Sequence, residues 1–184
     1  MAAMIMIQWI RMCLNISGQS FMTGGFRTLK YFTILSNLLE AFACVLFVIK
    51  RNELVKYVGA VSVGLTFTVV MVFLGPLFGY RMMFYGASLW FHALIPLMAM
   101  AEFVMCNRKE MTSRDNLYAV FPMLVYGIGY VGNIIIRGIP HNDWYGFMSW
   151  GYPVGTVIFA LIVAVTYLIG LLLRKINEKV GAGK

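Results

Sequence analysis

Long apolar runs separated by short polar stretches dominate the pattern along the chain. Five runs hold about 20 mainly apolar residues each, which is the length that a helix needs to cross the hydrocarbon core of a bilayer. They cover residues 29–49, 57–78, 84–105, 116–136 and 149–173. Residues 3–19 form a sixth, shorter run that contains Arg11. The pattern predicts one domain over residues 1–184, an all-α bundle of six transmembrane helices with a basic tail at 174–184.

Composition supports a membrane protein and excludes several other classes. Hydrophobic residues make up 61% of the chain and charged residues 12%, whereas a soluble domain is near half apolar and a quarter charged. The net charge of +8 sits between apolar runs, where it acts as a topology signal, so no nucleic-acid partner is predicted. The three cysteines show no metal or disulfide spacing, and we therefore expect neither a metal site nor a cofactor.

Lysine and arginine set the expected orientation. They concentrate in alternate connections and in the tail, and by the positive-inside rule these segments face the cytoplasm. The residues are Lys50, Arg51, Lys56, Arg108, Lys109, Arg114, Arg174, Lys175, Lys179 and Lys184. Both termini are then cytoplasmic. The Met-rich chain, whose first residues lack a basic n-region and a small-x-small cleavage site, favours a bacterial cytoplasmic membrane.

The second run carries a column of polar residues along its length. At about 100° per residue, Thr33, Ser36, Asn37 and Glu40 share one face of the helix. This face should point into the bundle, because a charge facing lipid at the centre of a helix costs about 2.5–3.5 kcal/mol. Interhelical bonding explains such a column without any further function. Arg11 lies at a depth similar to that of Glu40, and we hypothesise that the two residues form an ion pair.

His92 gives the column a candidate chemistry. It lies in the outer half of a span that runs in the same direction as the span of Thr33, at a similar depth. A neutral imidazole can take the proton of a threonine hydroxyl and make it a nucleophile. The alternative is an imidazole whose hydrogen bonds are satisfied by neighbouring groups. Because the pair would lie inside the apolar slab, the expected substrate is a lipid that enters from the membrane.

Acyl transfer also needs donors for an oxyanion. Asn37, Ser36 and Asn133 are candidates to supply them or to orient a substrate, although each could equally be a contact between helices. Glu102 follows His92 by ten residues, or about 15 Å along a helix, which is too far to orient the imidazole directly.

The motif YFTILSN at residues 31–37, followed by LWFHALIPLMAMAE at 89–102, resembles the androgen-induced membrane hydrolase family. This family includes the androgen-dependent regulator of tissue-factor-pathway inhibitor, and the resemblance extends over about residues 26–173. It implies an integral-membrane hydrolase of fatty acid esters of hydroxy fatty acids, with Thr33 as nucleophile and His92 as base. Glu102 stands where the family has an acidic residue.

Three other functions remain open. In a transporter, the polar column would line a path, with His92 and Glu40 relaying protons. In a haem protein, His92 would be an axial ligand, and His141 is the only other histidine. In a structural subunit, every polar group would join helices. The oligomeric state is left open.

Overall fold

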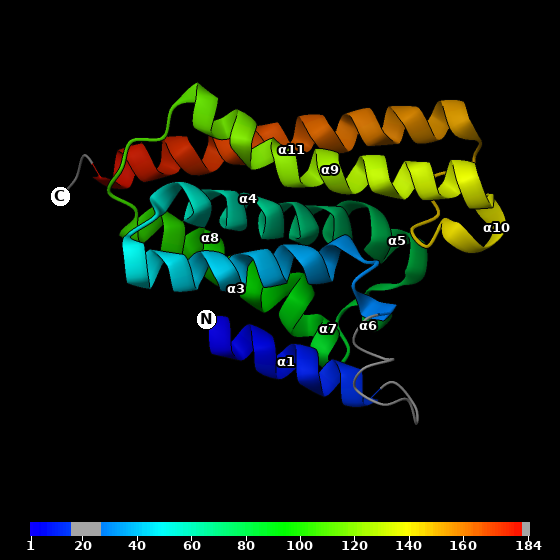
Figure 1. Cartoon of the computed structure of the whole chain (residues 1–184), viewed down its shortest axis with the longest axis horizontal. Coiled ribbons are helices and arrows are strands. Elements are labelled where there is room, and N and C mark those ends of the chain that lie inside the picture. Colours follow the sequence, from blue (N-terminus) through cyan, green and yellow to red (C-terminus); the bar gives the residue numbers. More distant parts are fainter. Residues whose placement is uncertain (16–26, 182–184) are drawn as a thin grey trace.

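The structure is a computed structural model that describes residues 1–15 and 27–181 (Figure 1). Two of the long helices are composite and contain a π-helical turn. One runs from α4 (Glu53–Val69) through η1 (Val70–Leu74) into α5 (Gly75–Phe78), and the other from α7 (Ala87–Leu89) through η2 (Trp90–Leu94) into α8 (Ile95–Cys106). The remaining helices are α1 (Ala2–Asn15), α3 (Phe32–Lys50), α6 (Tyr80–Met83), α9 (Ser113–Arg137), α10 (Ile139–Asn142) and α11 (Tyr152–Gly181).

Within the described residues, five helices are long and apolar enough to cross a membrane, which confirms the predicted all-α membrane bundle. The predicted first span differs from them. Helix α1 has 14 residues and is about 21 Å long, less than the ~30 Å of a bilayer core. Residues 16–19 of that predicted span lie outside the described residues. At the other end, α11 continues to Gly181, so residues 174–181 prolong the helix instead of forming a separate tail.

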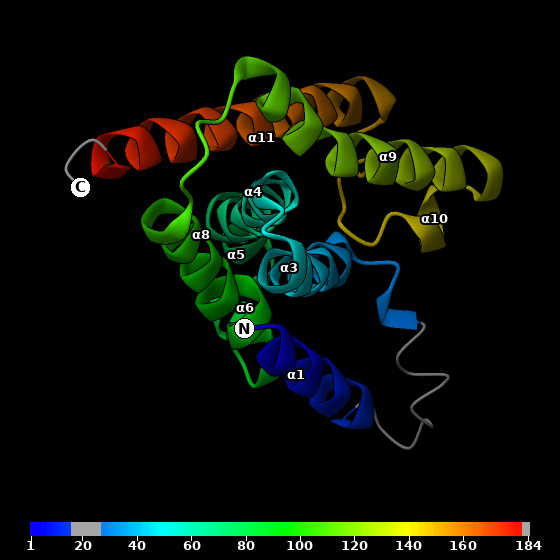
Figure 2. The same cartoon turned by 60° about the vertical axis from the view of Figure 1, so that its left-hand side comes forward.

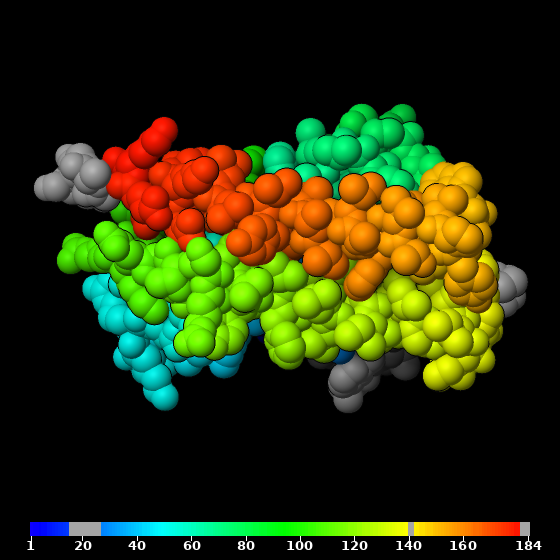
Figure 3. All heavy atoms as spheres, turned by 90° about the horizontal axis from the view of Figure 1, so that it is seen from above, coloured from blue at the N-terminus to red at the C-terminus, as the bar shows by residue number. Residues whose placement is uncertain are grey.

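Helix α4 forms the centre of the bundle. Figure 2 shows α3, α8, α9 and α11 arranged around it, with α1 on the outside against α3. Helices α9 and α11 lie side by side over one face (Figure 3). They approach closely at Gly127, where an added Cβ would lie 1.9 Å from the Phe159 ring. Helix α4 is thus the element against which the others bury their inward faces.

Local signals fix where the helices begin. The side chain of Asn52 accepts a hydrogen bond from Val55 N (3.1 Å) at the start of α4. At the start of α9, Thr112 and Asp115 form a reciprocal capping box, which satisfies two amides that the helix leaves unpaired. Helix α3 has no side-chain cap of its own, a feature that becomes important at the cavity described below.

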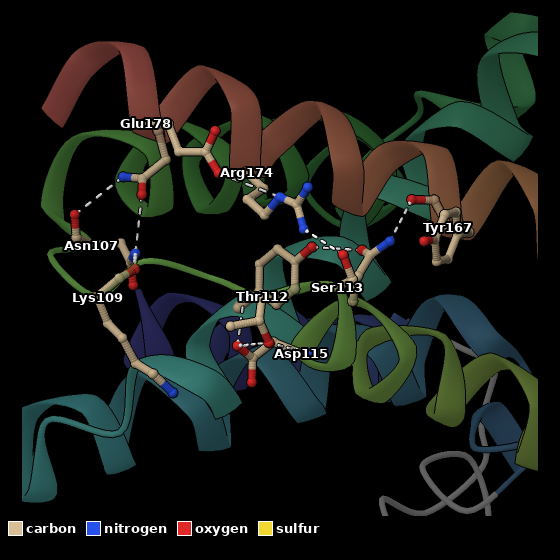
Figure 4. Close-up of polar contacts among 11 residues, drawn as sticks. Asn107, Lys109, Thr112, Ser113, Asp115, Tyr167, Arg174 and Glu178 are labelled. Carbon is tan, nitrogen blue, oxygen red and sulfur yellow. Dashed lines mark hydrogen bonds and ion pairs between the residues drawn. The ribbon is translucent and has the colours of Figure 1, made fainter. Parts of the chain in front are cut away.

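We call the end of the bundle with Lys50, Arg108 and the last turns of α11 the basic end. A polar network joins helices there (Figure 4). Tyr57 donates to Asn116 Oδ1 (2.6 Å), and Asn116 Nδ2 donates to the carbonyl of Tyr167 (3.1 Å). This network connects α4, α9 and α11. We call the opposite end the cavity end.

Candidate functional site

A cavity of about 340 Å³ opens at the cavity end and is lined by both Thr33 and His92. Most of its wall is apolar, and the described residues that line it carry no fixed charge. The other lining residues are Met12, Thr28, Tyr31, Ile34, Leu74, Phe78, Met82, Met83, Ser88, Phe91, Trp144 and Tyr145. The two residues that the sequence predicted to meet therefore face a common space.

Thr33 is the second residue of α3, so its hydroxyl lies at the positive end of the helix dipole. Among the described residues, the Thr33 hydroxyl makes no hydrogen bond, either to His92 or to any other group. Catalytic hydrogen bonds are often loose before substrate binds. The hydroxyl is thus free to be activated, and negative charge that develops beside it is stabilised by the helix.

The π-helical turn η2 sets the position of His92. Pro96 has no N–H to give to the carbonyl four residues earlier, which is that of His92, and its ring also crowds that carbonyl. The backbone hydrogen bond therefore spans one more residue than in an α-helix, and Ile95 N donates to Trp90 O. Such π-turns recur at functional sites because they re-aim side chains. Here the turn places the imidazole on the cavity wall.

The carbonyl of Met83 selects one tautomer of His92. The distance from Nδ1 to this oxygen is 2.6 Å. Because a carbonyl can only accept, Nδ1 carries the hydrogen, and Nε2 of the neutral ring keeps a free lone pair. The Met83 carbonyl thus holds the ring at Nδ1, the position that a carboxylate holds in a serine protease triad. The segment that carries Met83 is bounded by Gly79 (φ +91°) and Gly86 (φ +57°), conformations that favour glycine.

Tyr145 is a site residue that the sequence analysis did not identify. Its hydroxyl accepts a hydrogen bond from Phe32 N (2.7 Å) and so caps the first turn of α3, beside Thr33. Burial raises the pKa of Tyr145 well above its ordinary value, so the phenol keeps its proton at neutral pH. A buried, protonated hydroxyl beside Thr33 is the type of donor that an oxyanion requires.

The segment after α10 holds Tyr145 in place. Asp143 accepts bonds from the Tyr130 hydroxyl and from Met148 N, which shapes the turn that carries Tyr145. The ring of Tyr145 stacks on Phe147 at a centroid distance of 5.1 Å. Trp144 Nε1 donates to the Tyr126 hydroxyl (3.1 Å). These contacts anchor the segment to α9 and leave the phenol little freedom to move.

The three residues expected to donate to an oxyanion have other partners. Asn37 uses its amide hydrogens on the carbonyls of Thr33 (2.7 Å) and Phe91 (3.2 Å), and so joins α3 to η2. Ser36 bonds to the Thr66 hydroxyl (2.9 Å). Asn133 donates to Asn142 Oδ1 (3.3 Å) and does not line the cavity. Each is a contact between or within helices, which was the alternative interpretation.

The hypothesised ion pair of Arg11 with Glu40 is wrong. Arg11 is exposed and donates to Gln8 Oε1 (3.4 Å). Glu40 is fully buried and pairs with Lys56, whose ammonium also contacts Glu102 (3.2 Å). The sequence analysis had assigned Lys56 to a loop, but it lies in the first turn of α4 with 2% of its side chain exposed.

Cys44 completes this group, which we call the Lys56 cluster: Glu40, Cys44, Lys56 and Glu102. Lys56 Nζ lies 3.1 Å from Cys44 Sγ, so its three hydrogens have three acceptors. The cluster joins α3, α4 and α8 nearer the basic end, and none of its members lines the cavity.

The second histidine, His141, adds no described side chain to the site. His141 lies in α10, but its side chain is outside the part that the structure describes.

No family model matches the chain, and no curated protein or solved structure matches it either.

Proposed function

We propose that this protein hydrolyses apolar carboxylic esters that enter the cavity from the bilayer, with Thr33 as nucleophile and His92 as general base. One observation carries the proposal. A single apolar cavity is lined by an unbonded Thr33 hydroxyl at a helix N-terminus and by an imidazole whose Nδ1 is fixed on the Met83 carbonyl. A nucleophile, a base and an orienting group for that base are the parts that acyl transfer requires.

In the first half-reaction, His92 Nε2 takes the hydroxyl proton while Thr33 Oγ1 attacks the ester carbonyl carbon. The oxyanion that forms is stabilised by the N-terminus of α3 and the Tyr145 hydroxyl. The intermediate collapses as protonated Nε2 gives its proton to the departing alcohol oxygen, which leaves the acyl group on Thr33. In the second half-reaction, Nε2 takes a proton from water, the hydroxide attacks the acyl carbon, and the carboxylic acid leaves as Thr33 recovers its proton.

The lining of the cavity supports a lipid substrate. Met82, Phe78 and Ile34 offer apolar surface to a substrate. The charged residues of the Lys56 cluster do not line the cavity. The resemblance to the androgen-induced membrane hydrolases favours a fatty-acyl ester as the class of substrate.

One substitution at His92 separates the roles of its two nitrogens. In His92→Asn the amide nitrogen can still bond to the Met83 carbonyl, but no base remains at the position of Nε2. We expect the variant to fold and to lose ester cleavage together with fluorophosphonate labelling of Thr33. Thr33→Ala should lose both activities, whereas Thr33→Ser should retain part of them. Full cleavage by purified Thr33→Ala would contradict the proposal.

A transporter is a second candidate, favoured by the polar column. Its residues continue along α3 from Thr33 at the cavity to Glu40 in the Lys56 cluster, and Glu102 of that cluster is 35% exposed. In this function, liposomes that contain the protein would carry a proton or solute flux abolished by Glu40→Gln and retained by Thr33→Ala. The hydrolase proposal predicts instead that Thr33→Ala abolishes the activity, which is ester cleavage.

A further inference from the structure

Thr33 also borders a second, smaller cavity. Its volume is about 40 Å³, and it shares Thr33, Leu74 and Tyr145 with the larger cavity. The rest of its wall includes Val70 of η1, Met123 of α9 and Ile162 of α11. His92 lines only the larger cavity. The nucleophile therefore lies between two spaces, and only one of them contains the base.

This asymmetry fixes the direction of a bound ester. The base that activates Thr33 must later protonate the departing alcohol oxygen, so that oxygen lies on the side of His92. The alcohol part of the ester then occupies the 340 Å³ cavity. The carbonyl oxygen points toward Tyr145 and the first turn of α3, and the acyl chain takes the remaining direction, into the smaller cavity.

We propose that the smaller cavity is an acyl subsite that accepts short acyl groups, such as acetyl or propionyl. The inference rests on the proposed hydrolase function. The smaller cavity's volume of about 40 Å³ is about one eighth of that of the larger cavity, about 340 Å³. A short acyl group therefore fits there more readily than a long chain, which must displace packed side chains or leave the cavity.

An aromatic pair separates the subsite from a neighbouring groove. Phe32 and Tyr126 line both the smaller cavity and a groove of about 180 Å³ between α3 and α9, so they form the wall between the two. Their ring centroids are 5.2 Å apart. Tyr126 is held by its bond to the carbonyl of Lys30 (2.7 Å) and by the indole of Trp144 (3.1 Å). A long acyl chain could reach the groove only if this pair separated.

The long apolar part of the substrate therefore belongs to the alcohol. This expectation differs from the one that the family resemblance carries, in which both parts of the ester are long chains. The two expectations can be separated with defined esters, because acyl length and alcohol length can be varied independently.

The test measures kcat/KM of the purified protein on two ester series. One series holds a dodecyl alcohol and lengthens the acyl group from acetyl to dodecanoyl. The other holds the acetyl group and lengthens the alcohol. One methylene that a pocket cannot accept typically costs about 10-fold or more. We expect at least a 100-fold fall from acetyl to hexanoyl in the first series and no such fall in the second. A wild-type preference for long acyl groups would overturn the inference.

Two variants that enlarge the smaller cavity, and one control variant, test whether this cavity holds the acyl group. Met123→Ala enlarges it, and Phe32→Ala connects it to the groove, so both should shift the preferred acyl length upward by two or more carbons. Met82 lines the larger cavity and not the smaller one, so Met82→Ala should leave the acyl preference unchanged. Acyl preference that moves with Met82→Ala, and not with the other two, would overturn the inference. If Thr33→Ala still cleaves the best ester, the proposed function itself fails, which is a distinguishable result.

Discussion

Removal of the ammonium of Lys56 should destabilise the fold more than any other single change of charge in the Lys56 cluster. In Lys56→Met, the hydrocarbon part of the side chain is nearly retained, so packing changes little. What is lost is the only cation among the described residues that contacts Glu40, which has no exposed surface. The carboxylate is then left buried without a counter-charge.

The magnitude follows from this burial. Removal of one partner of a buried ion pair costs about 3–5 kcal/mol, because the other charge remains uncompensated. In a domain of this size, 1 kcal/mol corresponds to about 2–4 °C in Tm. Lys56→Met should therefore lower the Tm by about 6–20 °C. Thermal unfolding of the protein in detergent micelles, followed by tryptophan fluorescence, measures this change.

Two comparisons isolate the electrostatic cause. Adding Glu40→Gln to Lys56→Met removes the stranded charge, and the double variant should recover at least ~2 kcal/mol relative to Lys56→Met alone. Lys50→Met removes an exposed lysine of α3 and should change stability by less than ~0.5 kcal/mol. If Lys56→Met unfolded at the same temperature as Lys50→Met, the buried pair would not contribute as its geometry requires.

Two further predictions concern the phenol at the site and the contact between α9 and α11. Tyr145→Phe keeps the ring packing but removes a donor beside Thr33, so kcat should fall by about 100-fold or more with little change in KM. The control variant Tyr126→Phe should retain more activity. Equal kinetics for wild type and Tyr145→Phe would exclude Tyr145 as the oxyanion donor. Gly127→Ala places a Cβ 1.9 Å from the Phe159 ring and should destabilise the protein by about 1–3 kcal/mol in chemical unfolding, while Gly129→Ala, with open space around it, should be neutral.

The spans could be predicted because their signal is local. An apolar run of about 20 residues indicates a membrane helix whatever its neighbours are, and the four central predictions agree with the helices within a few residues. Lys56 shows where the local signal fails. A lysine close to the start of a span is expected in a loop by sequence position alone, and only the packing of α3 and α8 against α4 brings Glu40 and Glu102 to it.

That Thr33 and His92 line one cavity was predictable in part for the same reason. Thr33 and His92 are unusual residue types inside apolar runs, so each drew attention by itself. Tyr145 did not, because aromatic residues are common near membrane interfaces and its partner Phe32 lies 113 positions away in the chain. The carbonyl of Met83 has no side-chain signature at all. The sequence lacked a carboxylate at the depth of His92, and the structure provides a peptide group in its place.

The absence of fixed charge from the described lining of the cavity has a consequence for catalysis. A carboxylate beside His92 would stabilise the imidazolium that forms during attack, but burying it in an apolar slab would cost several kcal/mol in the resting protein. The Met83 carbonyl orients the ring with less electrostatic stabilisation of the imidazolium and avoids that cost of burial. In the proposed reaction, charge at the site exists only transiently, as imidazolium and oxyanion formed together, and each is offset by the other and by the N-terminus of α3. A site of this kind can remain open to the hydrocarbon of a bilayer, from which an apolar ester would enter.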